Sequence, residues 1–127
     1  MKKPYLCGPI LGCTDEECKD WRYMARKELP DSLDPMRRDY RGKELDSYIE
    51  IVEQDKLDIL NCDCVLVNYT KPSVGTSMEI LFAWEQHKPV IVVAAQGVVI
   101  SPWLKYHTSH FFESFSQALH YIKYYGK

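Results

Sequence analysis

Short apolar runs typical of strands alternate with helical patterns along the 127 residues, which predicts an α/β fold built on a parallel sheet. Two of these runs, Cys64 to Tyr69 and Pro89 to Ala95, are almost continuously apolar, as in strands buried on both faces. The length suits a single domain, 1–127. Five strands and four helices are expected, so we predict a doubly wound, five-stranded sheet in a three-layer α/β/α arrangement of the flavodoxin-like type.

The first half of the chain is expected to contribute two strands and two helices. Lys3 to Cys7 forms the first strand, because Gly8-Pro9 interrupts it. A capping box of Thr14 and Glu17 opens a helix from about Asp15 to Lys27. The apolar face of that helix is expected to contain Trp21, Met24 and Ala25.

A short second strand is expected between Leu29 and Pro35, followed by a polar surface loop from Met36 to Lys43. Asp46 to Asn61 is predicted to be a helix whose inward residues, at helical spacing, are Tyr48, Ile49, Val52, Leu57 and Leu60.

The second half continues the alternation. Helices are predicted over Thr76 to Gln86 and Phe115 to Tyr125. A long connection, Gln96 to Tyr106, separates the strand that ends at Ala95 from a short last strand at His110 to Phe112.

Composition excludes several classes of protein. Hydrophobic residues make up 46% and charged residues 27%, which is ordinary for a globular protein, and the net charge of -2 disfavours nucleic-acid binding. The longest apolar stretch, Val90 to Ala95, is too short to span a bilayer, and the start lacks the apolar region of a signal peptide. We therefore expect a cytoplasmic protein that binds neither membrane nor nucleic acid. Its five cysteines fit no zinc spacing and are expected to be buried, reduced thiols.

Ligands of such a fold bind at the carboxyl ends of the strands, near the switch in strand order. Glu79 lies at the start of a helix after a strand, where the helix dipole favours the ionised form that nucleophilic attack requires. A competing interpretation is that Glu79 only closes a capping box with Thr76. The other residues expected at this edge are Tyr5, Gly8, Pro9, Asp34, Pro35, Asn68, Tyr69, Ser73, Gly75, Thr76, Gln96 and Ser101.

Other kinds of site find little support. There is no Gly-Lys-Ser/Thr triplet of a P-loop, no dinucleotide Gly-x-Gly-x-x-Gly pattern and no Gly-x-Ser-x-Gly elbow. His107 and His110 lack an evident third ligand, so no metal site is predicted.

Several motifs coincide with those of a known family. Tyr5-Leu-Cys-Gly-Pro, Asp55-x7-Asp63, Ser73-Val-Gly-Thr-Ser-Met-Glu79 and Lys88-Pro-Val resemble the nucleoside 2-deoxyribosyltransferase superfamily. That superfamily includes the 2'-deoxynucleoside 5'-monophosphate N-glycosidases. The resemblance extends from about Tyr5 to Ser101 and is most specific between Asp55 and Val90.

The resemblance implies roles for individual residues. Glu79 falls at the nucleophile that attacks C1' of the deoxyribose, Tyr5 at the tyrosine that orients it, and Asp55 at the acid serving the leaving base. Ser73 matches a serine that contacts the 5'-phosphate in the glycosidases, where many transferases have an aspartate. Ser101 resembles a phosphate-contacting serine supplied by a neighbouring subunit, which implies a homo-oligomer with shared sites.

These roles imply transfer of deoxyribose from a 2'-deoxyribonucleoside to another free nucleobase, through a covalent intermediate and without metal or organic cofactor. The alternative is hydrolysis of a nucleoside monophosphate, although Pro9 to Gly12 lacks the arginine that the glycosidases carry there. A non-catalytic nucleotide sensor is a third hypothesis. A phosphoacceptor receiver domain is disfavoured, because Asn68-Tyr69 stands where its aspartate would be.

Overall fold

Four parallel strands, in the order β1-β2-β3-β4, form the centre of the computed structural model, which describes residues 2–125. They are β1 (Pro4–Cys7), β2 (Cys64–Asn68), β3 (Val90–Val93) and β4 (His110–Phe112). The helices are α1 (Asp15–Glu28), the 3-10 turn η1 (Pro35–Arg37), α2 (Glu44–Asn61), α3 (Val74–Glu85), α4 (Pro102–Tyr106) and α5 (Phe115–Tyr124). The predicted domain, 1–127, also includes residues 1, 126 and 127, which lie outside the described residues.

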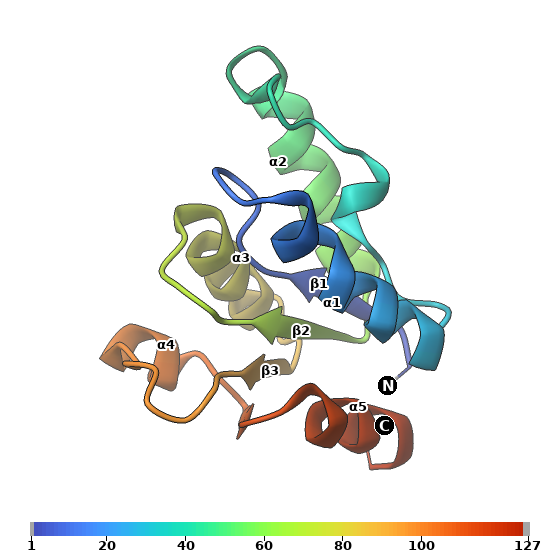
Figure 1. The fold of residues 1–127 in the computed structure, drawn as a ribbon, viewed down its shortest axis with the longest axis vertical. Coiled ribbons are helices and arrows are strands. Elements are labelled where there is room, and N and C mark those ends of the chain that lie inside the picture. The colour runs from blue at the N-terminus through green and yellow to red at the C-terminus, as the bar shows by residue number, and fades with distance from the viewer. Residues whose placement is uncertain (1, 126–127) are drawn as a thin grey trace.

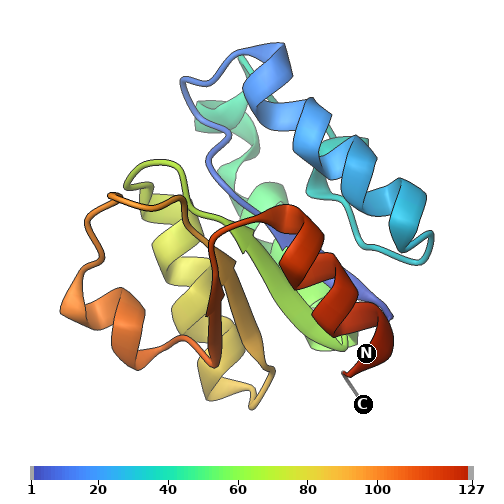
Figure 2. The same cartoon turned by 60° about the horizontal axis from the view of Figure 1, so that its bottom comes forward.

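The sheet lies between two layers of helices, which confirms the predicted α/β/α architecture (Figures 1 and 2). Helices α1 and α5 cover one face, where Trp21, Ala25 and Ile122 pack on Leu6, Leu66 and Ile91. Helices α2 and α3 cover the other face, where Ile59, Ile80 and Ala83 pack on Val65, Val67 and Val92. β2 and β3 are buried on both faces, as their apolar composition predicts.

The prediction of a fifth strand is wrong. Of the predicted strand between Leu29 and Pro35, only Leu33 pairs with β1, as an isolated parallel bridge to Tyr5 with hydrogen bonds to Leu6 and Pro4. Pro30 and Pro35 flank this segment and cannot donate backbone hydrogen bonds, which limits the length of any strand here. Leu33 nevertheless lies on the outer side of β1, so the switch in strand order falls between β1 and β2.

Side chains of β1 alternate between the two faces of the sheet, as in any strand. Tyr5 and Cys7 therefore face α2 and α3, whereas Leu6 faces α1 and α5. This alternation places Tyr5 and Cys7 under the helices that carry Asp55 and Glu79.

Helix α1 begins with the predicted capping box of Thr14 and Glu17, but its buried face differs from the prediction. Met24 is 62% exposed and Arg22 is fully buried in its place. The Arg22 guanidinium donates to the carbonyls of Cys18 (2.7 Å), Gly8 (3.0 Å) and Leu6 (3.3 Å). Because each of its three nitrogens donates to a carbonyl, the cation can be buried.

The predicted inward face of α2 is also wrong. Of the residues in α2, Ile59 and Asp58 are buried, whereas the predicted inward residues are about half exposed: Tyr48, Ile49, Val52, Leu57 and Leu60. An 18-residue helix is about 27 Å long, but strands of four or five residues span only about 13–17 Å. Helix α2 therefore extends past the sheet (Figure 1). None of the described helices has the length and apolar character needed to cross a membrane.

Candidate active site

The carboxylate of Glu79 is held by two side chains of β1. Glu79 lies in the second turn of α3 and accepts a hydrogen bond from the hydroxyl of Tyr5 at Oε2. The thiol of Cys7 lies 3.5 Å from Oε1, at hydrogen-bonding distance for sulfur. Tyr5 and Cys7 are both buried, so their positions, and hence that of the carboxylate, are fixed by the sheet.

The alternative that Glu79 only caps its own helix is wrong. Ser73 is the N-cap of α3, and its hydroxyl accepts the backbone N–H of Thr76. The helix thus starts at Val74, two residues before the predicted start at Thr76, because Ser73 provides an earlier cap. Glu79 is then too far into the helix to bond the N-cap amide, and its carboxylate turns toward β1 instead.

Asp55 of α2 lies near Glu79, and each of the two carboxyls acts on the pKa of the other. Its side chain is 21% exposed, so Asp55 is no ordinary solvated surface charge. Oδ1 of Asp55 also accepts a hydrogen bond of 3.2 Å from Nη2 of Arg38, in the loop after η1. The structure therefore brings together the three residues predicted to be catalytic: Tyr5, Asp55 and Glu79.

This arrangement makes Glu79 a weaker acid than usual. Burial, and then the negative charge of Asp55, raise the pKa of Glu79 to about 7, while the bonds from Tyr5 and Cys7 oppose the rise. Burial also raises the pKa of Asp55, and Arg38 opposes that rise. Burial and the charge of Glu79 raise the pKa of Tyr5 and of Cys7 well above their usual values. Tyr5 and Cys7 thus stay neutral hydrogen-bond donors, and Glu79 and Asp55 are placed to hold one proton between them.

Gly8 and Pro9 follow β1 and are buried beside this group. A Cβ on Gly8 would lie 2.9 Å from the Trp21 ring and 3.3 Å from the carbonyl oxygen of Asn68. Glycine is therefore required for the close approach of the β1 and β2 ends. The Gly8 carbonyl is also a partner of Arg22, whose charge lowers the pKa of both Glu79 and Cys7.

The start of α3 contributes a second set of predicted residues. Ser73 is partly exposed as the N-cap, and Gly75 is exposed with open space around its Cβ position. Thr76 is buried, and its hydroxyl oxygen has no hydrogen-bond partner among the described residues. The adjoining loop carries Lys71, whose ammonium lies 3.7 Å from the Glu17 carboxylate of α1 and near Cys13 of the loop after β1.

Two predicted substrate-binding residues do not join the Glu79 group. Asp34 is the N-cap of η1, where it accepts the N–H of Met36 at 2.8 Å and pairs with Arg26 at 3.2 Å. Ser101 is the N-cap of α4, and its hydroxyl accepts the N–H of Trp103.

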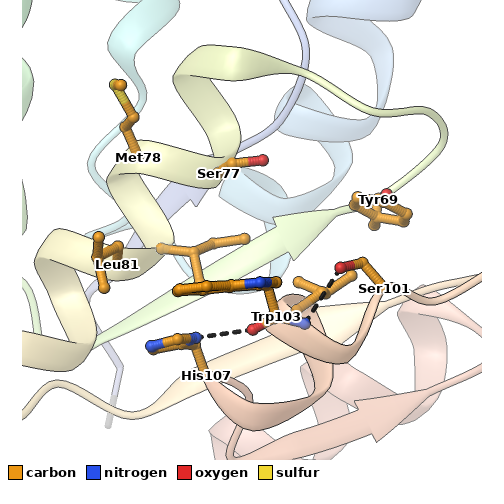
Figure 3. Close-up of a pocket in the computed structure, with 9 residues that line it drawn as sticks. Tyr69, Ser77, Met78, Leu81, Ser101, Trp103 and His107 are labelled. Atoms are coloured by element: carbon orange, nitrogen blue, oxygen red, sulfur yellow. Dashed lines mark hydrogen bonds between the residues drawn. The ribbon is translucent and has the colours of Figure 1, made fainter.

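The side chain of Ser101 lines a separate cavity of about 290 Å³. Figure 3 shows it with Tyr69 and Trp103 on the side of α3 that carries Ser77, Met78 and Leu81. Neither Tyr5, Asp55 nor Glu79 lines this cavity. Ser101 therefore belongs to a different surface from the Glu79 carboxylate of the same chain.

Sequence reasoning missed Cys7, Arg22 and Arg38 as neighbours of the Glu79 group. Cys7 could have been found, because it lies two residues after Tyr5 on the same face of one strand. Arg22 and Arg38 carried no such signal, since an arginine in a helix or polar loop is usually solvated.

The two histidines considered as metal ligands have different partners. His107 Nδ1 lies 2.7 Å from the carbonyl of Trp103, and His110 Nε2 lies 2.9 Å from the hydroxyl of Tyr121. Within residues 2–125, no three His, Cys, Asp or Glu side chains gather as potential metal ligands.

Known proteins resemble this chain in sequence pattern and in fold. The family model described as nucleoside 2-deoxyribosyltransferase matches residues 4–118. No match was found among curated proteins. One similar solved structure is a 2-deoxyribosyltransferase from the psychrotolerant bacterium Bacillus psychrosaccharolyticus, with TM-score 0.74 and 20% identity over 94% of this chain and 91% of that chain. Another is the CMP N-glycosidase BcmB of Clostridium botulinum, with TM-score 0.62 and 16% identity over 95% of this chain and 98% of that chain. The two structures share the α/β fold described above.

Proposed function

Since the chain belongs to the nucleoside 2-deoxyribosyltransferase family, we propose that it cleaves the N-glycosidic bond of 2'-deoxyribonucleosides and transfers the deoxyribose to another nucleobase. The observation that carries this proposal is the Glu79 carboxylate, held by Tyr5 and adjacent to a second carboxyl, Asp55. A nucleophile with an orienting donor and a neighbouring acid is the arrangement that displacement at C1' requires.

The reaction proceeds in two displacements. An oxygen of ionised Glu79 attacks C1', the bond from C1' to the base nitrogen breaks, and its electron pair leaves with the base. Asp55 gives its proton to the departing base as the covalent deoxyribosyl ester forms on Glu79. In the second step a nitrogen of the incoming base attacks C1', the ester bond breaks, and the proton of the incoming base returns to Asp55.

The raised pKa of Glu79 suits this cycle. At about 7, it allows Glu79 to be ionised in a substantial fraction of molecules at neutral pH. The reactive form has one proton on the pair, with Glu79 ionised and Asp55 protonated. Tyr5 favours this form, because its hydroxyl stabilises the Glu79 carboxylate.

A second candidate is a hydrolase that releases free base from 2'-deoxynucleoside 5'-monophosphates. Ser73 favours it, since a serine at the start of α3 accommodates a phosphate better than an aspartate does. Lys71 also favours it, because its ammonium supplies a cation between the loops after β1 and β2, where the sequence lacks an arginine. The same Glu79 ester would form, and water instead of a base would then attack C1'.

A chromatographic assay distinguishes these reactions. The protein is incubated with a deoxynucleoside and a different free base, and in parallel with each deoxynucleoside monophosphate. A new nucleoside indicates the transferase, whereas free base formed only from a monophosphate indicates the hydrolase. Glu79→Ala should abolish both products, and Glu85→Ala, an exposed glutamate of the same helix, should retain activity.

Ligand binding must be measured alongside turnover, because a nucleotide sensor would share the fold. Glu79→Ala should still bind nucleoside, as the sugar and base contacts remain. Wild-type protein that binds nucleosides by calorimetry but releases neither base nor new nucleoside would refute catalysis and support the sensor.

We also propose that the protein is a homo-oligomer in which Ser101 serves the site of a neighbouring subunit. The position of Ser101 in a cavity apart from Glu79 supports this arrangement. The half-exposed apolar side chains of α2 give the chain a surface that a second copy could cover. Light scattering combined with size-exclusion chromatography measures the oligomeric state, and a monomeric, fully active protein would refute the proposal.

A further inference from the structure

Arg38 forms a bridge between two carboxylates on one face of α2. Its Nη2 lies 2.8 Å from Oδ2 of Asp58 and 3.2 Å from Oδ1 of Asp55. Asp55 and Asp58 are three residues apart, so their side chains emerge next to one another on the helix. The side chain of Arg38 is only 19% exposed, and those of Asp55 and Asp58 are 21% and 9% exposed. The three groups thus form a largely buried ionic cluster beside Glu79.

The neighbouring Arg37 makes a useful contrast. Its Nη2 lies 2.7 Å from Oδ1 of Asp58, and its Nη1 donates to the carbonyl of Asp34 at 2.8 Å. Its side chain is 46% exposed, and no salt bridge joins it to Asp55 in the described part of the chain. Among the described residues, only Arg38 forms a salt bridge with Asp55.

We propose that Arg38 is a positioning residue of the reaction, which holds Asp55 against Glu79 and ensures that the two carboxyls carry one proton instead of two at neutral pH. This inference rests on the proposed function, because it concerns the pair that performs the two displacements. It assigns a role in catalysis to a segment that the sequence predicts to be a polar surface loop, Met36 to Lys43.

The charges around Asp55 explain why one cation matters. Asp55 lies beside two other carboxyls, those of Asp58 and Glu79, and like charges at short range favour protonation. Tyr5, Cys7 and Tyr40, on whose pKa values Asp55 acts, stay neutral near pH 7. Two other cations act on its neighbours: Arg22 lowers the pKa of Glu79, and Arg37 pairs with Asp58. Arg38 is therefore the cation that offsets the burial of Asp55.

Without Arg38, both carboxyls of the pair would hold their protons to higher pH. A larger fraction of molecules would then carry both protons at neutral pH, and in those molecules Glu79 is unable to attack C1'. The guanidinium also has a geometric part, because both contacts run through Nη2 and the planar group fixes the directions of its N–H bonds. A lysine ammonium turns freely at the end of a flexible stem and lacks that constraint. Charge and shape can therefore be tested separately.

The test compares Arg38→Gln, Arg38→Lys and the control Arg37→Gln across pH 5 to 9. For each protein, kcat and kcat/KM are measured with the deoxynucleoside that the wild type converts. An opposite charge at this distance typically lowers the pKa of an acid by about 1–3 units. We expect both limbs of the Arg38→Gln profile to move to higher pH by about one unit, the lower end of that range. The pH–rate profile of Arg37→Gln should have its acidic and basic limbs at the same pH as that of the wild type.

Arg38→Lys retains the charge and loses the planar group that fixes the N–H directions at Nη2. We expect its limbs to stay near those of the wild type while kcat falls, because Asp55 is held less well. If Arg38→Gln does not fold, as judged by circular dichroism, Arg38→Lys carries the test. If the limbs of the Arg38→Lys pH–rate profile move to higher pH although the charge is retained, the inference is overturned.

Two outcomes distinguish the inference from the proposed function. An Arg38→Gln profile that differs from wild type only in height, with its limbs unmoved, overturns the role of Arg38 and leaves the reaction intact. A wild-type protein that forms no product from any deoxynucleoside or monophosphate overturns the proposed function itself.

Discussion

Replacing Glu79 by glutamine should stabilise the protein at neutral and alkaline pH. The pKa of Glu79 is about 7 in the folded protein, against 4.5 for a free glutamate. Each unit of pKa difference corresponds to about 1.4 kcal/mol, so keeping Glu79 ionised in the fold costs about 3 kcal/mol. That is a large share of the roughly 5–15 kcal/mol by which natural domains are stable.

The sign follows from proton binding. The folded state binds the Glu79 proton more tightly than the unfolded state, so the free energy of unfolding falls as pH rises from 4.5 to about 7. Below 4.5 both states are protonated and the cost is absent. Above 7 both states are ionised and the whole cost is present. Glutamine carries no charge, and its side-chain oxygen can still accept the Tyr5 hydroxyl.

Urea unfolding followed by circular dichroism at pH 5, 6, 7 and 8 measures this difference. We expect Glu79→Gln to be more stable than the wild type at pH 8 by up to about 3 kcal/mol. The advantage should shrink toward pH 5. Glu85→Gln, an exposed neighbour in α3, should follow the wild type throughout. A Glu79→Gln variant that is equally or less stable at pH 8 would refute the assignment of Glu79 as a destabilised carboxylate.

Three further predictions concern activity, packing and assembly. Tyr5→Phe removes a charge-assisted hydrogen bond to Glu79 of about 1.5–3 kcal/mol, so kcat/KM should fall by about 10- to 150-fold. The acidic limb of its pH–rate profile should also move to higher pH, because the pKa of Glu79 rises without this bond. Gly8→Ala should destabilise the fold by about 1–3 kcal/mol in urea unfolding, because its methyl group meets Trp21 and the Asn68 carbonyl, whereas Gly75→Ala should not. Ile49→Asp should lower the mass measured by light scattering without loss of secondary structure, because Ile49 is 57% exposed on α2; an unchanged mass would argue against α2 as the interface.

Most of the site could be predicted because the fold fixes which ends of the strands meet. Once β1 and β2 are adjacent and parallel, Tyr5 and the start of α3 lie at the same edge of the sheet. The contact between Tyr5 and Glu79, seventy-four residues apart, follows from that topology together with the alternation of side chains in β1. Local patterns thus located the residues, and the register of the sheet brought them together.

Other features depend on interactions that no local pattern contains. The burial of Arg22 requires carbonyls from the end of β1 and from α1, and these converge only in the folded chain. The apolar spacing of α2 did not identify its buried face, because α2 is longer than the strands it covers and the buried positions include the charged Asp58. Leu33 could not be extended into a strand, because prolines lie at both sides of its short segment.

The burial of the cysteines has a practical consequence. Cys7, Cys18, Cys62 and Cys64 are each at most 2% exposed, whereas Cys13 is partly exposed in the loop between β1 and α1. A maleimide dye should therefore label the native protein at Cys13 alone, with no cysteine removed. Because Cys13 also contacts Lys71 of the β2–α3 loop, the dye would lie where the two loops meet. Its fluorescence would then report ligand binding in real time, independently of turnover.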